Sequence, residues 1–143
     1  MTCSPYKSAM DRRLKKIYIA TLCIYLTAVA LLCFLKPSSL PEVDIKTFLG
    51  IPIDKCLHFL MFLPFPILAG LVFTDNERSF LSGLAIMTVL AVVGSGLAYG
   101  TELIQAHTGY RAYEIEDFIA DAIGICAGTV IFLSYTIITR LKK

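Results

Sequence analysis

The sequence predicts an all-α fold, an integral membrane bundle of four transmembrane helices. The chain of 143 residues has a mean hydropathy of +0.73 and is 17% charged, whereas soluble domains are about 25% charged. Four apolar runs are long enough to cross the hydrocarbon core, which takes about 17–25 helical residues. None of these runs shows the polar–apolar alternation of a β-barrel wall.

The first two apolar runs differ in how continuous they are. The first, 17–35, contains no charge, is long for a cleavable signal peptide and is followed by no A-x-A-like site. The second, 57–73, contains Pro64 and Pro66, which remove backbone donors from a helix. We therefore expect two spanning helices here, the second of them kinked at its prolines.

The third and fourth apolar runs carry small residues that favour close helix packing. The third, 80–99, is uncharged, and the fourth, 118–138, has Asp121 as its only charge. Gly124 and Gly128 continue the face of Asp121, and glycines let a neighbouring backbone approach closely. We expect the third and fourth helices to pack tightly, because the third offers matching small positions: Ala91, Gly94, Ser95, Gly96, Ala98 and Gly100.

The distribution of lysine and arginine predicts which ends of the helices face the cytoplasm. Nine of these residues lie in the two tails and the turn at 74–79, against four in the loops at 36–56 and 100–117. In membrane proteins the excess of Lys and Arg lies in the cytoplasmic flanks. We therefore predict that both termini are cytoplasmic and that the two longer loops face outward.

Length, net charge and cysteine content limit the number of domains, the kind of partner and the presence of disulfides. A chain of 143 residues suits one domain, so we predict a single membrane domain over 1–143. The net charge of +2 gives no broad basic footprint for nucleic acid. The cysteines form no CxxC pair and indicate no disulfide framework; they are Cys3, Cys23, Cys33, Cys56 and Cys126.

Polar residues gather near the helix ends on the predicted outward side. Several are spaced three or four residues apart, which puts them on one face of a helix. Ionised groups are costly in hydrocarbon, so we expect them to converge in one cluster at the outer interface. The expected members are Asp54, Lys55, His58, Glu102, Gln105, Arg111, Asp117 and Asp121.

Structural roles compete with functional ones at several of these positions. Asp54 would also serve as the N-cap of the second helix. Lys55 fits an interfacial snorkelling anchor better than a catalyst. His58 lies one turn inside an apolar run, which favours a functional or network role. An unpaired Asp121 would cost about 2.5–3.5 kcal/mol, so we expect Arg111, Lys55 or His58 to pair with it.

The remaining polar positions keep their alternatives open. Glu102 and Gln105 fit either headgroup-level polarity or a structural hydrogen-bonded pair. Arg111 would bind a lipid phosphate or neutralise nearby acids. Glu114 and Glu116 are interpreted as a solvated loop face.

The ordered set of these residues resembles the VanZ-like family, small bacterial membrane proteins named after a teicoplanin-resistance protein. The resemblance covers roughly residues 50 to 130, and the ordered set is more specific than any one piece. The family commonly has Asn where this chain has Asp121, and the acid makes pairing with a basic residue more pressing. The resemblance rests on Asp54-Lys55-x-x-His58-Phe59, Glu102-x-x-Gln105 and Arg111-x5-Asp117-x3-Asp121-x2-Gly124-x3-Gly128.

The resemblance implies a multi-pass protein of the bacterial cytoplasmic membrane, with a role in the cell envelope and a contribution to glycopeptide resistance. It implies no particular reaction. The expected partners are the lipid bilayer, a phospholipid or lipid-linked cell-wall precursor, and either further copies of the chain or a partner membrane protein. Nucleic acid is not among them.

Three functions from different classes follow from the residues. The first is binding or modification of an envelope lipid or lipid-linked cell-wall precursor at the outer membrane face. The second is a non-enzymatic interaction protein whose polar cluster is structural. The third is a small transporter in which Asp121 and His58 relay a proton or ion, which with four spans would require an oligomer.

The first function is preferred and gives each polar residue a role. His58, Glu102 and Asp117 are the predicted catalytic residues, with His58 as general acid or base. No cofactor and no metal are predicted, because the chain has no dense ligand motif such as HExxH. A divalent-cation site built from His58, Glu102, Asp117 and Asp121 stays open as an alternative. The predicted substrate-binding residues are Asp54, Lys55, Gln105, Arg111 and Asp121.

Overall fold

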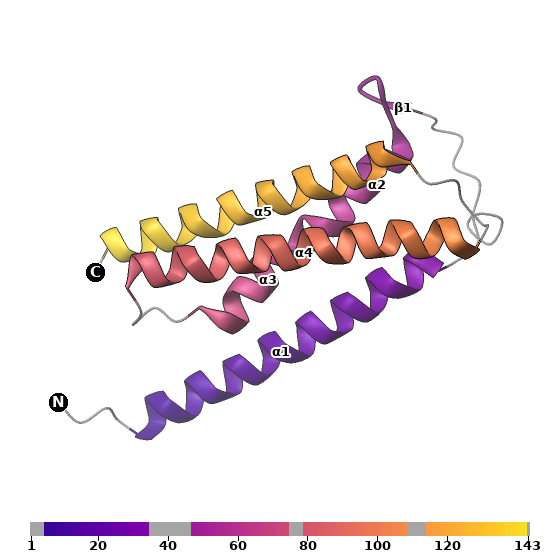
Figure 1. The fold of residues 1–143 in the computed structure, drawn as a ribbon. Coiled ribbons are helices and arrows are strands. Elements are labelled where there is room, and N and C mark those ends of the chain that lie inside the picture. Colours follow the sequence, from indigo (N-terminus) through magenta and orange to yellow (C-terminus); the bar gives the residue numbers. More distant parts are fainter. Residues whose placement is uncertain (1–4, 35–46, 75–78, 109–113, 143) are drawn as a thin grey trace.

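The computed structural model describes residues 5–34, 47–74, 79–108 and 114–142. Long helices dominate it, and four helical segments are long and apolar enough to cross a membrane, which confirms the predicted fold class. The start of α1 and the end of α5 lie at the same end of the bundle (Figure 1). The elements are α1 (Pro5–Phe34), β1 (Thr47–Phe48), β2 (Ile51–Pro52), α2 (Ile53–Phe62), α3 (Pro64–Phe73), α4 (Phe80–Thr108) and α5 (Ile115–Leu141).

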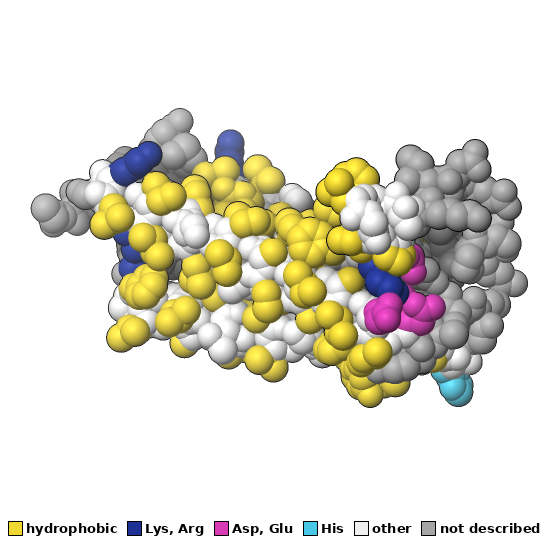
Figure 2. Space-filling view, turned by 90° about the horizontal axis from the view of Figure 1, so that it is seen from above, with side chains coloured by type: hydrophobic (Ala, Val, Ile, Leu, Met, Phe, Trp, Pro, Cys, Tyr) yellow, Lys and Arg dark blue, Asp and Glu magenta, His cyan; other side chains and the backbone are white. Residues whose placement is uncertain are grey.

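The bundle presents hydrophobic side chains on its outside and has only a small interior. Ile24, Val92 and Val130 are 71%, 68% and 63% exposed. Figure 2 shows such side chains spread over the face in view, with the Asp and Glu side chains gathered toward one end. This distribution suits a lipid environment, where an exposed aliphatic side chain carries no cost of hydration.

The second spanning segment, Ile53–Phe73, consists of two helices. Helix α2 ends at Phe62 and α3 begins at Pro64, as predicted from the prolines. Pro64 and Pro66 have no N–H and cannot bond to the carbonyls four residues earlier. The hydroxyl of Tyr25 on α1 donates to the carbonyl of Met61, which satisfies an acceptor beside the break.

A short hairpin leads into α2. Strands β1 and β2 pair antiparallel, with Phe48 opposite Ile51. Leu49 and Gly50, between them, both have positive φ, at 52° and 81°. Positive φ at both central residues is the geometry of a tight two-residue hairpin turn. The apolar-run pattern gave no indication of this hairpin.

The closest backbone approach in the bundle corrects one prediction. The glycine face of α5 lies against α2 and the start of α3, not against α4 as we expected. A Cβ atom on Gly124 would lie 2.5 Å from the carbonyl oxygen of Phe59, and one on Gly128 would lie closer still to the carbonyl oxygen of Leu63. Helix α2 also makes the most extensive contact with α5.

Helices α4 and α5 do contact one another, through some but not all of the small positions expected on α4. Ala98 and Ile125 are 0% and 1% exposed and share one core cluster. Gly94 faces the ring of Phe65, whereas Gly96 and Gly100 have no atom within 4 Å of an added Cβ. The small residues of α4 therefore do not form a continuous seam with the glycines of α5.

Candidate functional site

Five polar side chains are buried in the described part of the chain, and they lie at the end of the bundle away from the chain termini. They come from α2, α4 and α5, which are distant in sequence. The side chains of Asp and Glu in Figure 2 gather at that end beside a basic side chain. The buried residues are His58, Glu102, Gln105, Asp117 and Asp121, all of them in the set predicted to converge.

His58 lies between two buried carboxylates of α5. Its Nδ1 atom is 3.0 Å from Oδ1 of Asp121, and its Nε2 atom is 3.4 Å from Oδ2 of Asp117. The three side chains are 5%, 0% and 6% exposed. An ionised carboxylate can only accept, so when Asp121 is ionised the shorter contact has its proton on Nδ1 of His58.

Backbone packing explains why these three groups meet. Asp117 and Asp121 are four residues apart and therefore share a face of α5. One turn further along this face, Gly124 admits the carbonyl of Phe59. The residue before Phe59 is His58, so the close approach of α2 brings the imidazole over both acids.

Lys55 closes the cluster toward its exposed rim. Its Nζ atom lies 2.9 Å from Oδ1 of Asp117, 3.0 Å from Glu114 and 3.2 Å from Glu116. Its fourth partner, Asp54, is 3.9 Å away. A lysine at a helix end that holds α2 to the start of α5 in this way is more than an interfacial anchor.

The possible capping role of Asp54 is not observed. The N-cap of α2 is Pro52, and no side-chain hydrogen bond caps this helix. Asp54 instead sits in the first turn, half-buried, beside Lys55. An acid there is still favourable, because it faces the positive end of the helix dipole.

Glu102 enters the cluster from α4, whose helix continues past the apolar run to Thr108. The residue is 2% exposed. Its Oε1 atom has no hydrogen-bond partner among the described residues. One ligand atom each from Glu102, His58 and Asp117 lie within 4.8 Å of one another.

Gln105 is buried but is engaged by the neighbouring helix α1. Its Nε2 atom donates to the carbonyl oxygen of Cys33, at 2.9 Å. Cys33 lies in the last turn of α1, where carbonyls have no intrahelical partner. This bond ties α4 to α1 beside the cluster, and it differs from the pairing of Gln105 with Glu102 considered from the sequence.

Two expectations about charge have different outcomes. Arg111 lies outside the described residues. Glu114 and Glu116, interpreted from the sequence as a solvated loop face, are 52% and 69% exposed but both contact Lys55. For Glu114 the signal was its spacing of three residues from Asp117, which puts both on one side of the start of α5. The spacing gave no such signal for Glu116.

Among the described residues, the cluster carries more acid than base. Six carboxyl groups lie around one ammonium group, that of Lys55, and one imidazole, that of His58. Crowded carboxylates favour the approach of protons or cations. The acids are Asp54, Glu102, Glu114, Glu116, Asp117 and Asp121.

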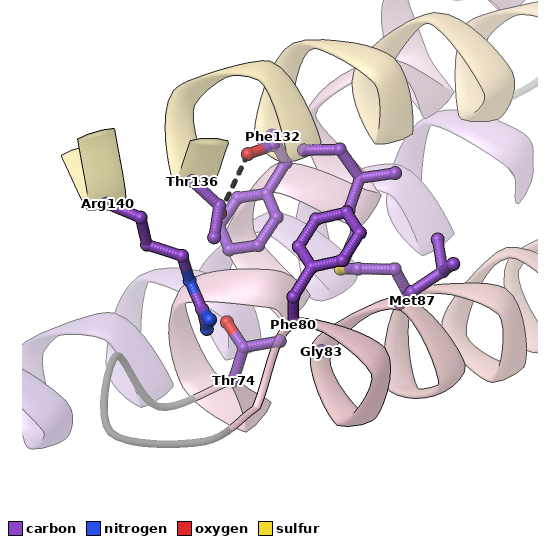
Figure 3. A pocket seen from close by; sticks show the side chains of 9 residues that line it. Thr74, Phe80, Gly83, Met87, Phe132, Thr136 and Arg140 are labelled. Atoms are coloured by element: carbon purple, nitrogen blue, oxygen red, sulfur yellow. Dashed lines mark hydrogen bonds between the residues drawn. The ribbon is translucent and has the colours of Figure 1, made fainter. Parts of the chain in front are cut away.

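A small pocket opens at the opposite end of the bundle, between the end of α3, the start of α4 and the end of α5. Arg140 extends toward Thr74 at its edge, and Phe132 and Phe80 form its wall (Figure 3). Among the described residues, no carboxylate or histidine lines it, so it shares no acid–base group of the polar cluster in that part of the chain.

Comparison with known proteins supports the resemblance seen in the residues. A family model described as VanZ/LLP1 matches residues 22–139, which cover α2, α3 and α4 completely, most of α5, and the part of α1 from residue 22 onward. No curated protein and no solved structure matches the chain. Four membrane-spanning helices and a family match over most of the sequence lead to one conclusion: this multi-pass membrane protein belongs to the VanZ/LLP1 family.

Proposed function

We propose that the protein binds and modifies the headgroup of an envelope lipid or lipid-linked cell-wall precursor, by acid–base chemistry at the outer membrane face. One observation carries the proposal. His58 is buried at the end of the bundle away from the termini, with Nδ1 on Asp121 and Nε2 facing Asp117. A histidine oriented by a carboxylate, with its second nitrogen directed into a polar site, is the arrangement that general acid–base catalysis requires.

The neighbouring residues suit a headgroup. Lys55 lies at the exposed rim and would contact a phosphate oxygen, with Arg111 as a second cation from the loop at 109–113. His58 would accept a proton from the attacking water or hydroxyl and return it to the departing oxygen. Asp121 would hold the imidazole in the required tautomer, and Asp117 would stabilise its protonated form.

The membrane side follows from charge. Basic residues are concentrated at the two ends of the chain, and the cluster lies at the other end of the helices. Cytoplasmic flanks are the basic ones, so the cluster would face outward. A headgroup site on that side of a bacterial cytoplasmic membrane would reach the lipid-linked precursors that glycopeptides bind, and so contribute to glycopeptide resistance.

A structural role for the cluster is the second candidate. Hydrogen bonds and ion pairs join α2, α4 and α5 to their neighbours at this end, and such polar contacts fix the register of helices. A proton relay across the membrane has less support, because every buried polar or charged residue of the described segments lies at one end.

Replacement of the two histidines separates the first two candidates. His58→Gln removes the acid–base group, and His107→Gln is a matched control at the exposed histidine of the same end of the bundle. The readouts are teicoplanin susceptibility, the headgroup composition of membrane lipids, and the amount of folded protein. We expect His58→Gln to abolish the envelope effect with folded protein unchanged, and His107→Gln to alter nothing.

Two results would contradict a catalytic role of His58. If His58→Gln lowers folded protein and envelope effect in parallel, while the protein that does fold retains its lipid effect, the cluster is structural. If the variant changes neither, His58 takes no part in the function. General acid–base groups typically contribute about 100-fold or more to rate, so partial effects should be resolvable.

A further inference from the structure

We infer that His58, Glu102 and Asp117 bind one divalent transition-metal ion, for which zinc is the best match. The three residues come from three helices, and one ligand atom of each lies within 4.8 Å of the other two. All three are buried, at 4%, 2% and 4% exposed. One imidazole and two carboxylates form a nitrogen–oxygen donor set of the kind that zinc accepts, with room for water or substrate as a further ligand.

The distance between His58 and Asp117 favours an ion over a shared hydrogen bond. Nε2 and Oδ2 are 3.4 Å apart, whereas charge-assisted N–H···O bonds measure about 2.7–2.9 Å. Two ligand atoms that each bind Zn²⁺ at about 2.0–2.2 Å with tetrahedral angles stand about 3.3–3.6 Å apart. The observed separation therefore matches one edge of a tetrahedral site.

The second nitrogen of His58 provides the supporting contact that metal-binding histidines have. Its Nδ1 is 3.0 Å from the carboxylate of Asp121, so the proton of the neutral ring lies on the side away from Asp117. This contact directs the lone pair of Nε2 toward the proposed ion. Asp121 would thus position the ligand without touching the metal.

Glu102 gives an independent indication of a ligand. Its side chain is buried, with only 2% of the residue exposed, yet its Oε1 atom has no hydrogen-bond partner in the described part of the chain. Buried polar atoms are normally satisfied, and an unsatisfied one calls for a bound water or ion. Because six carboxyl groups crowd this end, a cation satisfies both the oxygen and the charge.

This inference deepens the proposed function. Any part that the metal ion plays in the reaction rests on that proposed function. A metal ion would reduce the negative charge of the cluster and so admit a headgroup phosphate, which the carboxylates alone would repel. It would polarise a phosphoryl oxygen or activate the attacking water itself. While Nε2 of His58 binds the ion it does not accept a proton, so in the metal-loaded protein the ion would take over the activation of water assigned above to His58.

Metal content of the full chain tests the inference. The detergent-purified protein is stripped with a chelator, incubated with Zn²⁺, Mn²⁺ or Mg²⁺ alone, passed over a desalting column and analysed by elemental mass spectrometry. We expect about one Zn²⁺ per chain and no retained Mg²⁺. Glu102→Gln and Asp117→Asn should each weaken Zn²⁺ binding by at least 100-fold, whereas Glu116→Gln, a matched control outside the ligand set, should leave it unchanged.

Spectroscopy covers the case in which a variant does not fold. X-ray absorption of the zinc-loaded native chain should show nitrogen and oxygen ligands with the scattering pattern of one imidazole. A folded native chain that retains no Zn²⁺, or a site without imidazole, overturns the inference, and so does equal binding by native protein and both ligand variants. Metal binding is measured without lipid, so the two proposals fail separately. A metal-loaded protein that changes no lipid refutes only the proposed function, and a lipid activity retained after complete metal removal refutes only the role of the ion in that reaction.

Discussion

Nδ1 of His58 lies 3.0 Å from Oδ1 of Asp121. The two residues are 63 positions apart in the chain, and their contact joins α2 to α5. Asp121 is 0% exposed and lies within the fourth apolar run. An unpaired acid there would cost about 2.5–3.5 kcal/mol on insertion scales. The pairing therefore explains how an apolar helix tolerates the acid, and it sets the orientation of the imidazole.

Substitution of Asp121 should depend on whether the new side chain still accepts a hydrogen bond. Asp121→Asn keeps an oxygen for Nδ1–H and should lower the free energy of unfolding by about 1 kcal/mol or less. Asp121→Leu leaves the ring nitrogen without that acceptor and should lower it by about 1.5–3 kcal/mol. Denaturant titration in detergent micelles measures both. Equal losses for the two variants would contradict the importance of this bond.

Lys55 should be more important for stability than its position at a helix end suggests. Lys55→Met leaves Asp117, whose side chain is 6% exposed, without its ammonium partner. We expect a loss of about 1–3 kcal/mol, below the 3–5 kcal/mol of a fully buried pair, because Lys55 is 15% exposed and its other partners face solvent. Lys142→Met, at an exposed position at the other end, is the control. Thermal unfolding in detergent gives the comparison, and similar midpoints for both variants would show that the ion pairs contribute little.

The glycine face of α5 should tolerate no side chain. Gly124→Ala and Gly128→Ala place a Cβ against the backbone carbonyls of Phe59 and Leu63, which cannot move as a side chain would. Overpacking of this kind costs about 1–3 kcal/mol or more, so folded yield should fall sharply. Gly96→Ala has open space around it and should be neutral or stabilising, by up to about 1 kcal/mol from helix propensity.

Size-exclusion chromatography of the three alanine variants, expressed in parallel, checks this prediction. A monodisperse Gly124→Ala protein with native yield would mean that α2 does not approach α5 as closely as described. Loss of the Gly96→Ala protein would instead indicate a contact of α4 outside the described segments.

Membrane orientation is the prediction on which the outer-face function depends. Both tails are predicted to be cytoplasmic, so a fluorescent protein fused after Lys143 should fluoresce and alkaline phosphatase fused there should be inactive. Alkaline phosphatase inserted between Leu49 and Gly50, at the exposed hairpin turn, should be active. The opposite pattern at both sites would place the His58 cluster on the cytoplasmic side and exclude an action on outward-facing precursors.

Much of the fold could be predicted from hydrophobic run length. Four apolar runs, two prolines in the second of them and the lack of alternation were enough to predict four spanning helices, the second of them kinked. The structure places the interruption at Leu63. The cost of isolated charge in hydrocarbon was enough to expect the acids and bases to gather at one end. These predictions rest on quantities that each segment carries by itself: its length, its hydropathy and its backbone donors.

The choice of neighbour could not be predicted in the same way. The glycine face of α5 was expected to meet α4 and instead receives α2, because contact depends on how side chains such as Phe65 and Ile125 fill the space between helices. Glu114 and Glu116 are exposed, as expected of a solvated face, but their shared contact with Lys55 was not foreseen. Periodicity identifies a face but not the helix that covers it.

The amino-acid sequence by itself therefore determined the helical membrane architecture, the proline break and the family, because these depend on local composition and on the order of a few residues. Only the tertiary structure decided that His58 lies between Asp117 and Asp121 and that Gln105 donates a hydrogen bond to α1. It also decided that Glu102 lies near His58 and Asp117. These relationships arise from the rotation of each helix about its axis and from the closeness that Gly124 permits, and both are set by packing across segments far apart in the chain.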